Sequence, residues 1–181
     1  MNIFMASNQA SRPSRIKCKA KSLYGLQDNP FSLPNPFQIC AILGVQTRFY
    51  DLGSLKGLYI AINGVPYVVL NTTLEEDTAR VVCAHELGHH VLHQDLATLH
   101  ILNEYERYRS QTKTEQEANL FAAQLLLPDK LLQETLAEEP DPARAAGILR
   151  VPPELLQLKL ADDGISCALP PSDFLRHTPN Q

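Results

Sequence analysis

The alternation of apolar and polar positions predicts a small β-sheet in the first half of the chain. Three short β-rich runs follow one another, at Thr47–Leu52, Gly57–Ile62 and Val65–Leu70. The dipeptide Asn63-Gly64 separates the last two runs, and Asn-Gly in this setting is the strongest short-range signal for a β-hairpin. The pattern therefore predicts a three-stranded, largely antiparallel sheet.

Helical periodicity dominates the rest of the chain. A short helix is expected to begin at Asn35-Pro36, because asparagine suits the N-cap and proline suits the first helical position. A longer helix is predicted from Thr73 to about His93, and further helices over Thr112–Leu127 and from Pro128 onward. Strands followed by helices predict an α+β fold.

Composition divides the chain into three parts. Residues 1–33 form a basic N-terminal tail and linker, residues 34–136 hold the sheet and the main helices, and residues 137–181 form a Pro-rich helical appendage and tail. Seven of the 13 prolines lie at or after Pro140. A chain of 181 residues has room for one folded domain with small additions.

Composition also excludes a membrane-spanning protein and argues against a secreted one. The longest apolar stretches reach only five or six residues, far below the roughly 20 that a membrane helix needs. The N-terminus lacks the apolar core of a secretory signal. The four cysteines are widely spaced, with no CxxC pair: Cys18, Cys40, Cys83 and Cys167. This pattern favours a cytoplasmic protein in a reducing compartment.

Charge is distributed unevenly. Residues 1–21 hold five lysines or arginines and no acid, whereas the whole chain carries a net charge of −4. A basic arm of this kind can contact nucleic acid or an acidic partner. The rest of the chain is acidic, however, which argues against nucleic acid as the main ligand. We interpret the arm as a solvated terminus.

One motif carries specific chemistry, the HExxH sequence His85-Glu86-Leu87-Gly88-His89 within the long predicted helix. The spacing i, i+4 places both imidazoles on one helix face, where two nitrogens can bind one zinc ion at about 2.0–2.1 Å. Glu86 is offset from the ligands and suited to act as general base on a metal-bound water. Chance predicts only about 0.012 such motifs in a chain of this composition, so the motif points to a metal site.

A catalytic zinc usually takes a third protein ligand. His93 is excluded because it lies about 12 Å along the helix from His85, and two nitrogens on one zinc are at most about 4 Å apart. The main candidates are Glu115 and Glu117 at the start of the next helix, and periodicity does not separate them. Weaker alternatives are Asp95, Glu104 and Glu106.

Over about residues 34–128 the chain resembles the ImmA/IrrE family of metallopeptidases. The resemblance rests on four blocks in order, PNPFQICAILGVQTRFYDL at 34–52, GLYIAINGVPYVVLN at 57–71, AHELGHHVLH at 84–93 and EQEANLFAAQLLLP at 115–128. It implies a minimal gluzincin-like zincin fold, with the small sheet packed on the HExxH helix, and one catalytic zinc ion. In that family the glutamate directly before Ala-Asn completes the metal site, which implies Glu117 beside His85 and His89.

The resemblance also implies a function. We expect a zinc endopeptidase that cleaves a specific regulatory protein, since family members include anti-repressors that cleave a helix-turn-helix repressor. Residues 1–34 are too short and too rich in proline and serine for such a domain, so the repressor is expected to be a separate protein. The alternative is a zinc-binding anti-repressor or toxin-like module that inactivates its partner without proteolysis.

The sequence also offers candidates for residues that orient the metal ligands, bind the substrate or stabilise the oxyanion. Larger gluzincins place an aspartate four residues after the third ligand to orient a histidine, but the position counted from Glu117 is Phe121. The strand Val65–Asn71 is a candidate edge for an extended peptide, and the alternative is an interior strand with no such role. Asn71 is expected to order the turn into the HExxH helix, and Cys83 to lie in the core. Candidate donors to the oxyanion are His90, His93, His100, Tyr105 and Tyr108.

Overall fold

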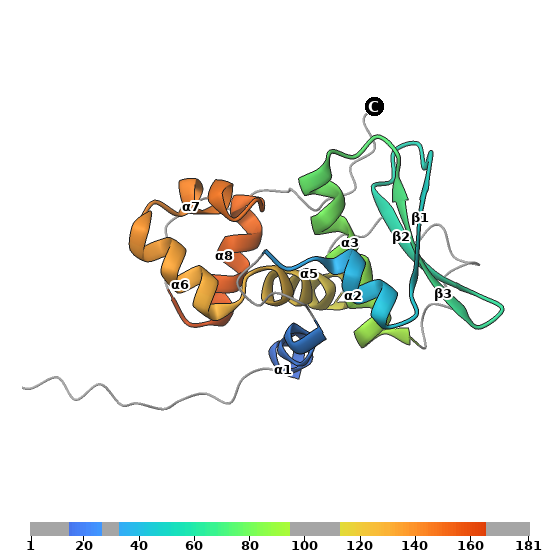
Figure 1. Ribbon diagram of the computed structural model, residues 1–181, viewed down its shortest axis with the longest axis horizontal. Coiled ribbons are helices and arrows are strands. Elements are labelled where there is room, and N and C mark those ends of the chain that lie inside the picture. Colours follow the sequence, from blue (N-terminus) through green and yellow to red (C-terminus); the bar gives the residue numbers. More distant parts are fainter. Residues whose placement is uncertain (1–14, 27–32, 95–112, 166–181) are drawn as a thin grey trace, which may run out of the picture.

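The computed structural model describes residues 15–26, 33–94 and 113–165. The first elements are α1 (Arg15–Ser22), the 3-10 turn η1 (Tyr24–Leu26), α2 (Pro36–Ile42), β1 (Gln46–Tyr50), β2 (Gly57–Ile62) and β3 (Val65–Asn71). The later elements are α3 (Glu76–Leu92), α5 (Lys113–Leu126), α6 (Asp129–Glu138), α7 (Pro142–Ile148) and α8 (Pro153–Asp162). The sheet lies at one end of the molecule, α6 to α8 lie at the other, and α3 and α5 lie between them (Figure 1). The predicted α+β fold is confirmed.

The sheet is mixed, with strand order β1-β3-β2. Strands β2 and β3 form the predicted antiparallel hairpin, and Asn63 and Gly64 both have positive φ, as a type I′ turn requires. Strand β1 instead runs parallel to β3. The largely antiparallel prediction is therefore wrong for β1. The physical reason is that β3, whose last four residues are buried, takes the central place and separates β1 from its sequence neighbour β2.

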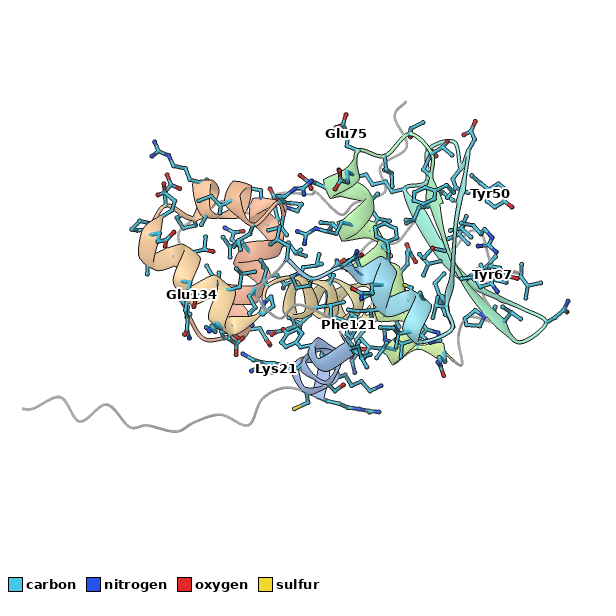
Figure 2. The ribbon with its side chains drawn as sticks, viewed as in Figure 1. Lys21, Tyr50, Tyr67, Glu75, Phe121 and Glu134 are labelled. Carbon is cyan, nitrogen blue, oxygen red and sulfur yellow. The ribbon has the colours of Figure 1, made fainter. Side chains whose placement is uncertain are left out.

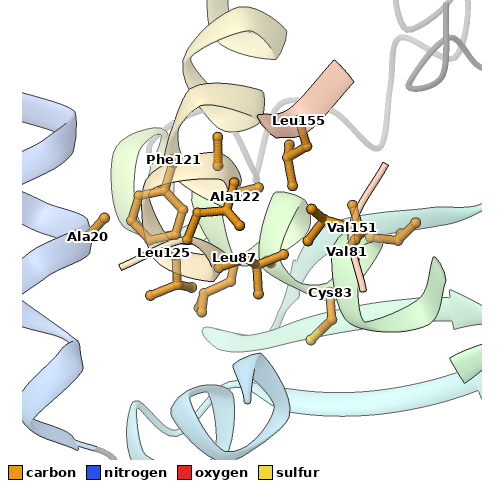
Figure 3. Packing of buried hydrophobic residues seen from close by; sticks show 14 of the residues in the cluster. Ala20, Val81, Cys83, Leu87, Phe121, Ala122, Leu125, Val151 and Leu155 are labelled. Carbon is orange, nitrogen blue, oxygen red and sulfur yellow. The ribbon is translucent and has the colours of Figure 1, made fainter. Parts of the chain in front are cut away.

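Helix α3 packs against the sheet on one side and against α5 on the other. Leu87 from α3 and Phe121 and Leu125 from α5 meet in the core (Figure 3). Phe121 lies at the centre of the molecule, whereas Tyr50 and Tyr67 lie on the side of the sheet away from the helices (Figure 2). The HExxH helix is thus held from both sides.

Gly88 lets the two helices approach closely. A Cβ added there would lie 3.1 Å from the Phe121 ring and 3.2 Å from the Cα of Ala118. We expect Gly88→Ala to lower the free energy of unfolding by about 1–3 kcal/mol, the usual cost of overpacking, although alanine favours a helix by about 1 kcal/mol. Urea unfolding followed by circular dichroism measures the change.

Gly147 in α7 is the matched control for this substitution, because a Cβ there would meet nothing within 4 Å. Gly147→Ala should therefore leave stability unchanged or raise it by up to about 1 kcal/mol. Equal effects of the two substitutions would contradict the close contact between α3 and α5.

Helix α1, which precedes residue 34, belongs to the same folded unit as the sheet and the later helices. Helix α1 packs against α5, and Ala20 and Leu23 are buried in the main core. The lysines of α1 are engaged within the chain: Lys17 pairs with Asp163, Lys21 pairs with Asp129 at 2.6 Å, and Lys19 Nζ donates to the carbonyl of Val91 at 2.7 Å. Part of the basic arm therefore serves to dock this helix, which weakens a nucleic-acid role for it.

A buried lysine joins α8 to this docking site. Lys159 Nζ, which is fully buried, donates to Gln124 Oε1 at 2.7 Å, Asp129 Oδ1 at 2.5 Å and Asp163 Oδ2 at 3.0 Å. Each of the three ammonium protons thus has an acceptor, as a buried charge requires. We call Lys159 and these three acceptors the Lys159 network. It fixes α5, α6 and α8 against one another.

Within the part of the chain that the structure describes, no helix is long and apolar enough to cross a membrane.

Candidate metal centre

His85 and His89 lie one turn apart on α3, and their Nε2 atoms are 3.2 Å from each other. Glu115, in the first turn of α5, brings one carboxylate oxygen to 3.2 Å from His85 Nε2 and the other to 3.3 Å from His89 Nε2. The three residues form a group of possible ligands whose atoms all lie within 4.8 Å of one another. Among the described residues, this is the one group of at least three such side chains.

These separations fit a tetrahedral metal ion. Ligand atoms at about 2.0–2.1 Å from a zinc ion, placed at tetrahedral angles, lie about 3.3 Å apart. The two Nε2 atoms are 3.2 Å apart, and each lies 3.2 or 3.3 Å from a different oxygen of the Glu115 carboxylate, so each of these pairs agrees with that value. Two imidazoles and one carboxylate also form a donor set typical of catalytic zinc, with a fourth position left for water. The residues present therefore fit zinc.

Glu117 does not join this group, which corrects the third-ligand prediction. Its Oε2 lies 2.9 Å from His93 Nε2 at the end of α3. Positions 115 and 117 are about 200° apart around a helix, so only one of the two carboxylates can face His85 and His89. The one that does is Glu115. The weaker alternatives Asp95, Glu104 and Glu106 lie outside the described residues.

Asn119 is a residue that the sequence analysis missed. Its Oδ1 and the Nδ1 of His85 are both buried, and neither has a hydrogen-bond partner among the described residues. The side chain lies close enough to His85 to help raise the pKa of that imidazole. Accepting the Nδ1 proton would leave Nε2 free for a metal ion. Asn119 lies four residues after Glu115, so counting from Glu117 led instead to Phe121.

The environment of His85 combines burial with negative charge. Burial lowers its pKa, but the hydrogen bond with Glu115 and the charges of Glu86 and Glu115 outweigh burial, so the pKa lies above the ordinary 6.5. Burial raises the pKa of Glu115, and hydrogen bonds from His85 and His89 bring it well below its usual range.

Zinc binding should consequently weaken as the pH falls, starting above pH 6.5. Protons compete with the metal for imidazole nitrogen, and a raised pKa of His85 moves this competition to higher pH. We expect the zinc Kd to rise progressively as the pH is lowered from about 8 to about 6. Competition with a chelating dye across this range measures it, and a Kd that stays constant would contradict the site.

Glu86 is only 4 % exposed and lies beside strand β2. A Cβ added at Gly57 would lie 3.3 Å from Glu86 Oε1 and 2.6 Å from Val82 Cγ1, so the glycine leaves room for the carboxylate. Tyr59 on the same strand lies with its Oη 2.9 Å from His90 Nδ1. Strand β2 therefore borders the metal centre.

The sheet order supports the interior alternative for the strand Val65–Asn71. The strand proposed from the sequence, β3, is central and pairs on both sides. The edges of the described sheet are β1 and β2, and only β2 lies beside Glu86. Of the candidate oxyanion donors, His90 is paired with Tyr59 and His93 with Glu117; His100, Tyr105 and Tyr108 lie outside the described residues.

Two smaller predictions are confirmed. Asn71 Nδ2 donates to the carbonyls of Gly53 and Leu55, and Asn71 Oδ1 accepts from the Thr73 backbone at 3.1 Å. The side chain thus orders both the loop before β2 and the turn into α3. Cys83 is fully buried, with its Sγ 3.8 Å from that of Cys40.

Comparisons with known proteins agree with the site. Residues 40–161 match the family model described as the IrrE N-terminal-like domain of a peptidase family. The chain is 33% identical over 102 residues to Metallopeptidase ImmA of Bacillus subtilis (strain 168), covering 56% of this chain and 59% of that protein. It is 32% identical over 130 residues to uncharacterized immunity region protein 2 of Bacillus phage phi105, covering 71% of this chain and 81% of that protein. The match thus spans less than two thirds of ImmA. Both the extent of the family match and the identity to the phage protein show that this chain belongs to the ImmA/IrrE family.

Proposed function

We propose that this protein is a cytoplasmic zinc-dependent endopeptidase of minimal gluzincin-like type. His85, His89 and Glu115 would bind one zinc ion, and Glu86 would act as the general base. The observation that carries the proposal is the convergence of two imidazoles and one carboxylate, with the two Nε2 atoms 3.2 Å apart and each 3.2 or 3.3 Å from one oxygen of Glu115. Membership of a peptidase family supports hydrolysis as the reaction.

In the proposed hydrolysis, the metal ion and Glu86 would have different tasks. When bound, zinc would lower the pKa of a coordinated water and polarise the peptide carbonyl. The Glu86 carboxylate accepts the proton from the attacking water and then donates it to the leaving amine. Its position against Gly57, with 4 % exposure, keeps it out of bulk water.

The substrate would bind as an extended peptide along β2. This strand pairs with β3 on one side, and its other edge has no strand partner among the described residues. An extended segment can add to such an edge through main-chain hydrogen bonds. Because Gly57 on β2 lies beside Glu86, a peptide on that edge would pass close to the general base.

The substrate we propose is a helix-turn-helix transcriptional repressor encoded separately. The resemblance to anti-repressors suggests this class, and the phage relative is named as an immunity region protein. The proposal predicts cleavage at a defined bond in one partner, because a peptide held by β2 must be extended and accessible.

Co-expression with the helix-turn-helix repressor encoded nearest to this protein tests the proposal. Intact mass spectrometry should reveal a defined repressor fragment with the wild-type protein and none with Glu86→Gln. The variant should still bind one zinc ion per chain, because Glu86 is not a ligand. A repressor inactivated equally by both proteins, without a fragment, would instead select the alternative of a zinc-binding module that acts by contact alone.

A further inference from the structure

We infer that Glu117 and His93 form a positioning pair that holds the first turn of α5 against the end of α3 and thereby sets Glu115 at the metal centre. His93 Nε2 donates to Glu117 Oε2 at 2.9 Å. This inference rests on the metal site proposed above. It gives Glu117 a role other than that of a ligand.

The first turn of α5 needs such a contact because its hydrophobic anchor lies further along the helix. The first buried residue of α5 is Ala118, and Glu115 lies almost one turn before it. The first turn of a helix also lacks the backbone hydrogen bonds that hold its middle. Side-chain contacts across to α3 must therefore contribute to its position.

His93 is well placed to provide this contact. Its side chain is only 10 % exposed, and its backbone N–H closes the end of α3 by donating to the His89 carbonyl at 2.9 Å. Its ring lies 5.5 Å from the His89 ring, centroid to centroid. A carboxylate bound to His93 is therefore held at a fixed point beside one of the two histidines that Glu115 contacts.

Glu117 shares its helical turn with Glu115, so a shift of one carboxylate shifts the other. Lys113 also lies near Glu117, at 3.7 Å, but its side chain is 87 % exposed. Exposed ion pairs contribute little. The hydrogen bond from His93 is thus the contact expected to matter, and Lys113→Ala provides a control that removes the neighbouring charge alone.

The test measures the zinc Kd of the full chain by competition with a chelating dye, together with the thermal midpoint of the metal-free form. We expect Glu117→Ala and His93→Ala each to raise the Kd about tenfold, the lower end of the range for residues that orient metal ligands. The double variant should show no further loss, because both single changes break the same contact. Glu117→Gln, which keeps an acceptor for His93, should recover most of the affinity. Lys113→Ala should leave the Kd within about twofold of wild type.

Glu115→Gln separates failure of this inference from failure of the metal site. If Glu115→Gln weakens zinc binding strongly and Glu117→Ala does not, the positioning role is overturned and the metal site stands. Losses in the two single variants that add in the double variant would also overturn the pair. If Glu115→Gln leaves the Kd unchanged, the proposed metal site itself is wrong. A lower thermal midpoint of metal-free Glu117→Ala without a change in Kd would show a purely structural role and overturn the inference.

Discussion

Replacing Glu115 with glutamine should weaken zinc binding by about two to three orders of magnitude. Structural zinc sites bind with roughly 10–16 kcal/mol, so one of about four ligands accounts for about 2.5–4 kcal/mol, and each 1.4 kcal/mol is a factor of ten. Glutamine keeps the size of the side chain but removes the negative charge that faces His85 and His89 at 3.2 and 3.3 Å. Zinc content after dialysis and the Kd from dye competition both report the loss.

Glu117→Gln is the matched control, since it makes the same chemical change two residues away. It should retain zinc with only a small loss of affinity, because Glu117 faces His93 and not the cluster. The reverse order, with Glu117→Gln losing zinc and Glu115→Gln retaining it, would restore the ligand that the family resemblance implies and contradict the geometry described above.

The second large effect is expected from Lys159→Ala, far from the metal centre. Removing this fully buried ammonium takes the donor from Gln124 Oε1 and leaves Asp129 and Asp163 paired, among the described residues, only with the lysines of α1. Breaking a buried ion pair in this way costs about 3–5 kcal/mol, which is a large part of the stability of a domain. Urea unfolding of the metal-free protein measures the loss, and zinc binding by the folded fraction should persist.

Lys159→Met provides a comparison for this prediction, because methionine fills a similar volume without a charge. It should also destabilise the fold, since Asp129 and Asp163 keep their charges, but less than alanine does because it leaves a smaller cavity. A change below about 1 kcal/mol in both variants would contradict the Lys159 network as a stabilising feature.

The sequence predicted those parts of the structure that local chemistry determines. The N-cap is one example, since Asn35 Oδ1 accepts from the backbone of Phe37 and Gln38 before Pro36 opens α2. The turn at Asn63-Gly64 and the paired histidines of α3 are others. In each case a few neighbouring residues carry the whole signal, so no knowledge of distant contacts is needed.

The features that the sequence did not predict depend on contacts between distant segments. The parallel pairing of β1 depends on which strand occupies the centre of the sheet. The central strand is β3, whose last four residues are buried. The choice between Glu115 and Glu117 depends on the rotation of α5 about its axis, which the contact of Ala118 with Gly88 helps to set. Helix α1 was missed because its lysines suggested a solvated arm, whereas their acceptors, Asp129 and Asp163, lie more than 100 residues away along the chain.

Anomalous X-ray diffraction at the zinc edge, on crystals of the zinc-loaded protein, tests the central claim most directly. We predict one strong peak between α3 and α5, about 2.0–2.2 Å from His85 Nε2, His89 Nε2 and a Glu115 carboxylate oxygen. Glu117 should remain hydrogen-bonded to His93. A peak bound by Glu117 in place of Glu115, or no peak at His85 and His89, would contradict it.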